Sequence, residues 1–216
     1  MKITDYSQIE AAVKESIENS FEKCSIVEEF LEGEEYSCEC ISYEGKHHFL
    51  ALTKKFTTGS PHFIETGHME PAEVSDETHE KIKQHILKAL DALGIKYGAS
   101  HAECKIDDKG NIGIVEIGSR MGGDCIGSHL VHISTGYDFV EMVLDVAMGE
   151  APKMIKSRAP KKAIVKFIFG QDDIEDLKRI KSENPEWIEF ISEIDNKCNT
   201  DIVDSSGRYG FYILAI

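Results

Sequence analysis

The chain lacks the residue patterns that mark several common classes of protein. Its 6 cysteines include no Cys-x-x-Cys pair and no Cys/His spacing of the zinc-finger or zinc-ribbon kind. No apolar run approaches the roughly 20 residues needed to cross a membrane, and the N-terminal residues lack the apolar core of a signal peptide. These absences predict reduced thiols, a cytoplasmic location and no membrane partner.

Basic residues are also scarce relative to acidic ones. The 24 Lys and Arg stand against 39 Asp and Glu, which gives a formal net charge of −15. Nucleic acid is therefore not an expected partner, because neutralising phosphates needs clustered Lys and Arg. ATP is not excluded, since a magnesium ion and a few placed cations can offset a triphosphate locally.

The first half of the chain predicts a helix followed by an antiparallel meander. Apolar residues recur at three- and four-residue steps through residues 8–20, as on one face of a helix. Three short runs rich in β-branched and aromatic residues follow at 24–31, 34–45 and 46–56. We expect these runs to form three antiparallel strands.

The middle of the chain predicts one long helix and a hairpin. Ser75 is a good N-cap, and residues 76–93 place apolar side chains on one stripe before Gly94 ends the pattern. Two apolar runs, 98–107 and 110–119, then flank a turn that ends in Asp-Lys-Gly. The hairpin is expected to be part of the same sheet as the meander.

The end of the chain predicts a smaller unit. Helical patterns around residues 130–133 and 139–148 are followed by Pro152 and a basic stretch, which resemble a linker. The remainder alternates as strand, helix, strand, strand. The fold class is therefore α+β, with an antiparallel sheet flanked by helices in residues 1–152 and a small C-terminal α/β appendix of β-α-β-β order in residues 153–216.

Each strand of the hairpin carries a glutamate, Glu103 or Glu116. Two carboxylates that face each other across a hairpin can hold Mg²⁺, with Mn²⁺ as an alternative, while nucleotide phosphates complete the coordination. Four residues after Glu116, Arg120 lies in a loop with Gly122 and Gly123, where backbone and guanidinium can approach phosphate oxygens. The pattern predicts a metal and anion site, although exposed glutamates and loop arginines are also common on ordinary surfaces.

Four segments carry a family resemblance. They read VEEFLEGEEYS, TKKFTTGSPHFIETGHMEPA, GASHAE and VEIGSRMGGD, and together they span about residues 26–150. In this order and spacing they resemble the C-terminal portion of carboxylate-amine ligases of the ATP-grasp superfamily. The branch they resemble contains bacterial L-amino-acid (dipeptide) ligases and carbamoyl-phosphate-synthase-like proteins.

The resemblance implies ATP and Mg²⁺ as cofactors and assigns roles to residues of the nucleotide site. Main-chain groups of Phe30 and Leu31 would bind adenine from a hinge strand, with Glu28 accepting from its amino group. Glu35 would hold the ribose hydroxyls. The two hairpin glutamates would be the magnesium ligands.

The same resemblance implies a phosphate contact and a substrate site. Lys55 would reach the phosphates, with neighbouring Lys54 as a rival for that role. Glu65 and His68 match an E-x-x-H motif that contacts the amino-acid substrate or the attacking amine. Arg120 would stabilise the acyl phosphate and the tetrahedral species that follows it.

Three positions bear on how far the resemblance extends. Gly118 stands where many members have an asparagine ligand, so the metal must rely on two carboxylates. Asp124 stands where some dipeptide ligases have a bulky aromatic residue, and it would favour a cationic or polar substrate side chain. The role of Arg208 is left open, since its side chain could reach the substrate site or lie in solvent at a turn.

The chain begins only about one helix before the hinge segment, whereas the resemblance implies an N-terminal half before that point. We therefore expect a fragment, a truncated chain or a split gene product, without turnover by this polypeptide alone. Its partners would be ATP, a small carboxylate or amino-acid substrate, and either the missing half or a second copy in a homo-oligomer, because a cut sheet exposes apolar surface.

Three functions are compatible with these patterns. The first is an ATP-dependent carboxylate-amine ligase, which forms an acyl phosphate and then an amide on an amino-acid substrate. The second is a non-catalytic nucleotide-binding or assembly module. The third is a carbamoyl-phosphate-synthase-like ligase that acts on bicarbonate, and the E-x-x-H segment favours an amino acid over it.

Overall fold

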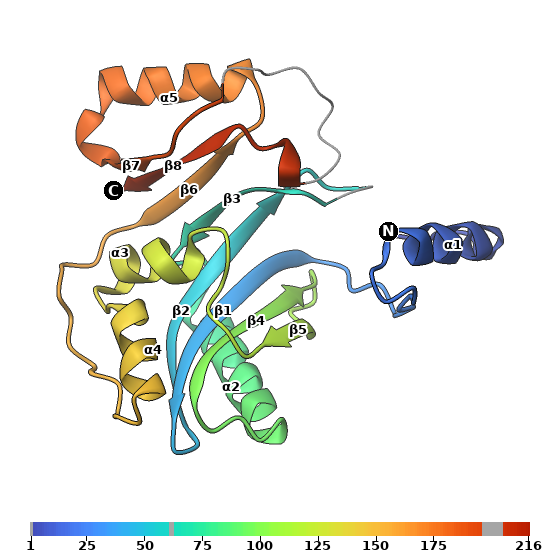
Figure 1. Ribbon diagram of the computed structural model, residues 1–216, viewed down its shortest axis with the longest axis horizontal. Helices are drawn as coiled ribbons and strands as arrows, with labels where there is room; N and C mark the ends of the chain where they lie inside the picture. Colours follow the sequence, from blue (N-terminus) through green and yellow to red (C-terminus); the bar gives the residue numbers. More distant parts are fainter. Residues whose placement is uncertain (1, 61–62, 196–204) are drawn as a thin grey trace.

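The structure is a computed structural model that describes residues 2–60, 63–195 and 205–216 (Figure 1). Within them, eight strands form one antiparallel sheet in the order β5-β4-β1-β2-β3-β6-β8-β7. The strands are β1 Glu34–Tyr43, β2 Lys46–Thr57, β3 Glu65–Glu70, β4 Gly98–Ile106, β5 Ile112–Gly118, β6 Ala163–Ile168, β7 Ile188–Ile191 and β8 Gly210–Ala215. The α-helices are α1 Ile9–Asn19, α2 Asp76–Ala92, α3 Val131–Thr135, α4 Phe139–Ala147 and α5 Gln171–Glu183.

Helices cover both faces of the sheet, which confirms the predicted α+β class (Figure 1). On one face, Ile82, Ile86 and Leu90 of α2 pack against the apolar side chains of β1, β2 and β4. On the other face, Val131 of α3 and Phe139 of α4 pack against different residues of the same three strands. Side chains on a strand point alternately to opposite faces, so each of these strands contributes to two layers.

The predicted long helix and hairpin are both confirmed. Helix α2 begins after Ser75, whose hydroxyl accepts a hydrogen bond from the backbone N–H of Thr78 at 3.1 Å. Strands β4 and β5 pair across a turn in which the carboxylate of Asp107 accepts from the backbone N–H groups of Lys109 and Asn111. Local patterns were sufficient for these elements because capping and turn chemistry act over a few residues.

The predicted strand at residues 24–31 is wrong. These residues form no strand in the structure, and Ile26 and Val27 remain 80% and 71% exposed. A strand needs a neighbour for its backbone N–H and C=O groups, and here the described chain places none beside this segment. At its end, Leu31 packs against the backbone of Gly113 on β5, which anchors the segment to the sheet.

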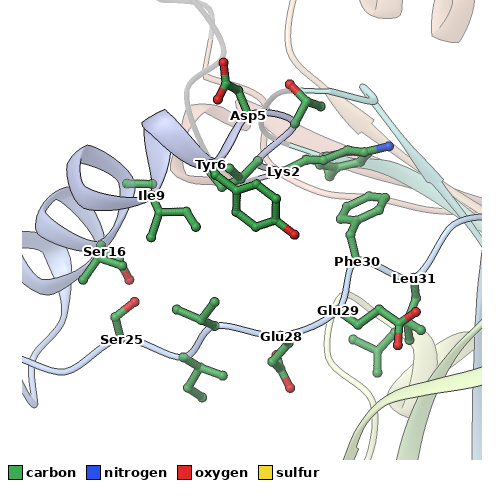
Figure 2. Close-up of a pocket in the computed structure, with 18 of the residues that line it drawn as sticks. Lys2, Asp5, Tyr6, Ile9, Ser16, Ser25, Glu28, Glu29, Phe30 and Leu31 are labelled. Atoms are coloured by element: carbon green, nitrogen blue, oxygen red, sulfur yellow. The ribbon is translucent and has the colours of Figure 1, made fainter.

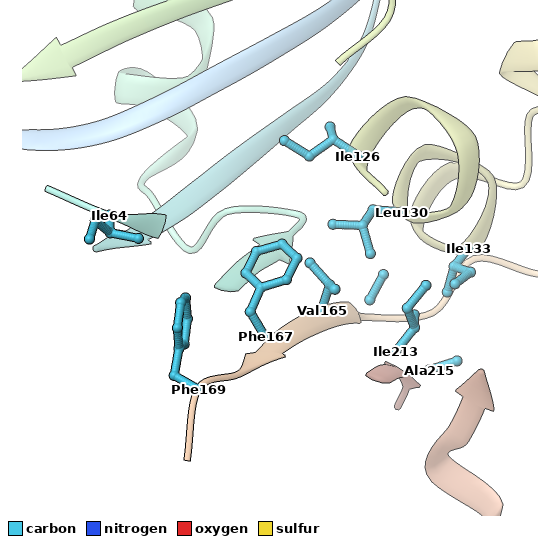
Figure 3. Packing of buried hydrophobic residues seen from close by; sticks show 10 residues of the cluster. Ile64, Ile126, Leu130, Ile133, Val165, Phe167, Phe169, Ile213 and Ala215 are labelled. Carbon is cyan, nitrogen blue, oxygen red and sulfur yellow. The ribbon is translucent and has the colours of Figure 1, made fainter. Parts of the chain in front are cut away.

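The predicted order of strand, helix, strand and strand after residue 152 is present as β6, α5, β7 and β8. Strand β6 pairs with β3, so these elements extend the same sheet. A cluster of buried side chains also joins the two segments, with Leu130 packed near Val165, Phe167 and Ile213 (Figure 3). The division into two domains stays a prediction, and it would separate parts that share a sheet and a core.

Candidate functional site

The face of β1, β2 and β4 that points away from α2 carries a group of charged side chains. Lys55 on β2 is the centre of this group, and its side chain is only 4% exposed. Its Nζ lies 2.7 Å from an oxygen of Glu103, 3.0 Å from Glu35 and 3.3 Å from Glu65. The structure thus brings together four residues that the sequence predicted separately.

The carboxylates around Lys55 stabilise its positive charge. Burial alone would lower the pKa of the ammonium group, but hydrogen bonds and charge from Glu103 and Glu35 raise it above its usual value. Lys54, the rival for the phosphate role, points to the other face. There its Nζ lies 2.7 Å from Glu34 and 4.5 Å from the centre of the Tyr36 ring.

Glu103 and Glu116 occupy directly opposite positions on β4 and β5. Opposed residues of an antiparallel pair point to the same face, so both carboxylates lie on the charged side of the sheet. The register shifts just after Glu103, where Cys104 pairs with Ile114 and one residue of β5 bulges out. In this register the two glutamates face each other across the hairpin, as a shared metal site requires.

The two carboxylates differ in exposure. Glu116 is exposed, whereas the side chain of Glu103 is 18% exposed and contacts two cations, Lys55 and His101. Burial raises the pKa of Glu103, but hydrogen bonds from His101 and Lys55 outweigh it and lower the pKa to about 2. Among the described residues no cluster of three His, Cys, Asp or Glu could hold a metal, so a cation here would need further oxygen ligands.

Two residues behind Glu103, His101 and Glu39, were not predicted from the sequence. His101 places Nε2 3.2 Å from Glu103, and its Nδ1 forms a short hydrogen bond with the fully buried Glu39 of β1. Glu39 also accepts the backbone N–H of Gly122 at 2.9 Å. Burial lowers the pKa of His101, but hydrogen bonds from the imidazole to Glu103 and Glu39 raise it to about 9. One signal was available, because Glu39 is a charged residue between Cys38 and Cys40 in a buried strand.

A second charged group lies beside the first. Arg208 donates a hydrogen bond to Asp124 at 2.7 Å and another to Glu65 at 3.4 Å, while its guanidinium lies 3.7 Å from the ring centre of Phe167. Because Glu65 contacts both Lys55 and Arg208, it joins the two groups. Arg208, left open from the sequence, therefore reaches a residue of the predicted substrate motif.

His68 lies under this second group and is only 1% exposed. Its Nε2 is 3.8 Å from Asp124, too far for a hydrogen bond, and neither ring nitrogen has a hydrogen-bond partner among the described residues. Burial raises the pKa of Asp124, but His68 and Arg208 lower it below its usual range. Since Arg208 neutralises Asp124, the expected preference of Asp124 for a cationic substrate side chain loses much of its basis.

The predicted catalytic Arg120 is not brought into either group. It is exposed in the loop after β5, and its guanidinium donates to the carbonyl oxygen of neighbouring Met121 at 2.9 Å. No hydrogen bond or ion pair links it to Glu103 or Glu116 in the described part of the chain. Its role stays a prediction.

The residues predicted to bind adenine line a cavity of about 740 Å³ between α1 and the segment before β1 (Figure 2). Phe30 lies on its wall, 5.9 Å from the ring of Phe63, and Glu28 and Leu31 line it nearby. The Nζ of Lys105 lies 4.9 Å from the centre of the Phe30 ring and 3.9 Å from Glu35. The cavity therefore adjoins the charged face.

The helices in the described ranges give no sign of a membrane span. Each of them is too short or too polar to cross a lipid bilayer.

Comparisons with known proteins give a family and a fold. Residues 2–128, more than half of the chain, match the model of the ATP-grasp domain family. The alanine–anticapsin ligase of Bacillus subtilis is 30% identical over 157 residues, which are 65% of this chain and 33% of that protein. The L-amino acid ligase of Bacillus licheniformis has a TM-score of 0.79 at 24% identity, covering 99% of this chain and 55% of that one.

A more distant neighbour was solved with nucleotide and metal. It is the biotin carboxylase domain of Hydrogenobacter thermophilus 2-oxoglutarate carboxylase, in complex with MgADP and bicarbonate. Its TM-score is 0.67 at 17% identity, and the match covers 97% of this chain and 48% of that one.

The chain thus spans about a third of the length of the curated relative and about half of each solved chain. The family match includes the first group of charged residues, from Glu35 to Glu103, and the glutamate that faces it on β5. By this match, and by the sheet that carries those residues, the chain belongs to the ATP-grasp domain family.

Proposed function

We propose that this chain binds ATP with Mg²⁺ and forms the nucleotide half of a ligase that activates the carboxylate of an amino acid. The observation that carries the proposal is Lys55 held by three carboxylates, with Glu116 opposite Glu103 at the edge of the same face. A cation and two opposed carboxylates beside a cavity are the groups that a magnesium triphosphate requires.

The chain's own residues would bind the base of the nucleotide in the cavity and its phosphates on the charged face. The apolar wall at Phe30 and Leu31 suits a base. Glu35 contacts both Lys55 and Lys105, and the Nζ of Lys105 lies over the Phe30 ring. Lys55 is a point cation whose three carboxylate partners can exchange for phosphate oxygens. Arg120, on the loop that follows Glu116, is free to turn toward the transferred group because it is exposed.

Glu103 and Glu116 fit a hard divalent cation such as Mg²⁺ or Mn²⁺. Both offer carboxylate oxygens on one face, and Glu103 is kept ionised by its neighbours. When bound, the metal would neutralise phosphate charge and polarise the transferred phosphoryl group. The remaining ligands would come from phosphate and water, because the described residues contain no cluster of three His, Cys, Asp or Glu that could hold a metal.

The second charged group supports an amino-acid substrate. It presents a cation, Arg208, beside Glu65 and Asp124, so it carries the two signs of charge that a zwitterion carries. The relatives named as alanine–anticapsin ligase and L-amino acid ligase agree with this class. In the proposed reaction the substrate carboxylate attacks the γ-phosphate and ADP leaves, and an amine then displaces phosphate from the acyl phosphate to form an amide.

Two alternatives remain from other observations. A nucleotide-binding module without turnover is favoured by the position of Arg120, which contacts neither group of charged residues in the described part of the chain. A ligase acting on bicarbonate is favoured by the shared fold of the biotin carboxylase domain. Bicarbonate, however, carries only negative charge, whereas the second charged group presents both signs of charge.

Calorimetric titration of the chain with ATP, with and without Mg²⁺, tests the binding step. We expect magnesium-dependent binding that is lost in Glu103→Gln and weakened in Lys55→Met. Lys54→Met is the matched control, because it removes the neighbouring lysine from the opposite face and should bind as the wild type does. Failure of the wild-type chain to bind ATP with Mg²⁺ would contradict the proposal.

A phosphate-release assay with amino acids and with bicarbonate then separates the alternatives. Release that depends on an amino acid supports the ligase, and release with bicarbonate alone supports the carboxylase-like alternative. Binding without release under every condition supports the module.

A further inference from the structure

The buried carboxylate of Glu39 joins two parts of the site that are far apart in the sequence. Its side chain is fully buried, with one oxygen bonded to His101 Nδ1 on β4 and the other accepting the Gly122 N–H at 2.9 Å. Gly122 belongs to the loop that carries Arg120. Through His101, whose Nε2 lies 3.2 Å from Glu103, the same carboxylate is connected to a proposed metal ligand.

Stability does not explain this buried pair. Taking a carboxylate and an imidazole out of water carries a large desolvation penalty, and well-packed apolar residues often replace such pairs without loss of stability. The opposite face of the same strands is filled by apolar residues and cysteines, so this sheet is compatible with an apolar core. The pair instead fixes the orientation of the His101 imidazole, because both ring nitrogens face carboxylates that hold the plane of the ring.

The glycine at position 122 is explained by the same contact. A Cβ there would come within 2.6 Å of a Glu39 oxygen and 2.8 Å of His101 Nδ1. Gly122 is not among the glycines with a left-handed backbone, so the close approach itself excludes a side chain. At the next position, by contrast, a Cβ on Gly123 would meet nothing within 4 Å.

We infer that Glu39 and His101 are positioning residues that fix the Glu103 carboxylate and the loop from Ser119 to Gly123 relative to each other. Glu39 holds the loop through Gly122 and holds Glu103 through the His101 ring. The geometric part of the inference concerns the chain without any ligand, whereas its consequence for metal affinity depends on the proposed function.

The first test compares Glu39→Gln with Glu70→Gln. His101 Nδ1 and the Gly122 N–H meet different oxygens of Glu39, and in a glutamine one of these oxygens is replaced by an NH₂ group that cannot accept a hydrogen bond. Glu70 is the matched control because it is also a fully buried glutamate of this sheet, but its partners are the hydroxyls of Thr53 and Ser134.

In ligand-free NMR spectra, Glu39→Gln should accelerate hydrogen exchange at the Gly122 amide by about tenfold or more and shift the amide signal of Glu103. Glu70→Gln should change neither. Unchanged signals in Glu39→Gln would overturn the inference, and so would equal changes in Glu70→Gln, because the effect would then be one of buried charge in general.

The second test changes the loop side of the contact between Gly122 and Glu39. Gly122→Ala should disturb the His101 and Glu103 signals, since its Cβ displaces the Glu39 carboxylate. Gly123→Ala is its control and should leave those two signals in place. If both alanine variants shift them equally, the loop responds as a whole and the assignment to Glu39 fails.

A third measurement follows Mn²⁺ bound with ADP by electron paramagnetic resonance. Glu39→Gln should bind about 10- to 100-fold more weakly than the wild type at a temperature where both are folded, while Glu70→Gln binds normally. An unchanged affinity would overturn the positioning role. If the wild-type chain itself takes up no Mn²⁺ with ADP, the proposed function fails, and the ligand-free spectra alone decide the inference.

Discussion

The two faces of strands β1, β2 and β4 are built from alternate residues of the same segments, and only one of them carries a buried network of charge. Toward α2 the strands present Cys38, Leu52 and Cys104, which are buried against one helix. Toward the other side they present Lys55 and Glu103 in a network of charge. Alternation lets the face toward α2 be apolar, while the other face combines apolar contacts with α3 and α4 and charged groups that cost stability.

The largest loss of folding stability is expected from a substitution on the apolar face. Ile86 of α2 is completely buried, so Ile86→Ala is expected to lower the free energy of unfolding by about 2–5 kcal/mol. Urea denaturation measures this loss. Binding of ATP with Mg²⁺ to the fraction that remains folded should be unchanged, and a loss below about 1 kcal/mol would show that α2 packs loosely.

On the charged face, Lys55→Met is expected to cost about 2–3 kcal/mol at neutral pH. The change leaves Glu103 and Glu35 without their shared cation, and some exposure of Glu103 keeps the cost below that of a fully buried pair. Lys54→Met should stay within about 0.5 kcal/mol of the wild type, because Lys54 pairs with the exposed Glu34.

The pH dependence of this cost has a definite sign. The pKa of Glu103 is lowered to about 2 in the folded state, so its stabilising contribution is present above an unfolded pKa of 4.5 and is lost as the pH falls toward 2. The difference between Lys55→Met and the wild type should therefore shrink below pH 4.5. A difference that stays constant down to pH 3 would mean that lost packing, and not charge, sets the cost.

A smaller effect of opposite sign is expected at Glu70. Burial raises the pKa of this carboxyl to about 7, although hydrogen bonds from Ser134 and Thr53 oppose the shift. The folded state then holds its proton more tightly than the unfolded chain, whose pKa is 4.5, so wild-type stability falls as the pH rises from 4.5 to about 7. Glu70→Gln should match the wild type near about pH 4 and be about 1–2 kcal/mol more stable near about pH 8.

The smallest effect is expected where neither face is involved. Arg120 is exposed and bonds only to the neighbouring carbonyl of Met121 among its described contacts, so Arg120→Ala should change stability by less than about 0.5 kcal/mol. Thermal unfolding measures it. A loss above about 1 kcal/mol would show that this loop belongs to the packed structure.

Sequence patterns were sufficient where the structure depends on neighbours along the chain. The period of α2, its Ser75 cap and the turn between β4 and β5 are local. The register set by that turn would place Glu103 opposite Val115, and the bulge next to Glu103 brings Glu116 opposite it instead. The segment at 24–31 has the composition of a strand, but pairing depends on a neighbour that the described chain does not place there.

The contacts that the sequence did not predict share a different property, because they join residues that lie far apart in the chain. The bond between Glu39 and Gly122 spans 83 positions, and that between Asp124 and Arg208 spans 84. Spacing along one sequence contains no record of such pairs. A charged residue inside an apolar strand does raise the question of its partner, but only the fold answers it.

The most direct measurement of the central claim is paramagnetic broadening of amide signals by Mn²⁺ bound with ADP. The claim is that the charged face, and not the α2 face, holds the metal nucleotide. The amides of Glu103 and Glu116 should broaden together at low occupancy, while those of Ile82 and Ile86 in α2 stay sharp. Broadening centred on α2, or none at either glutamate when the nucleotide is saturating, would contradict it.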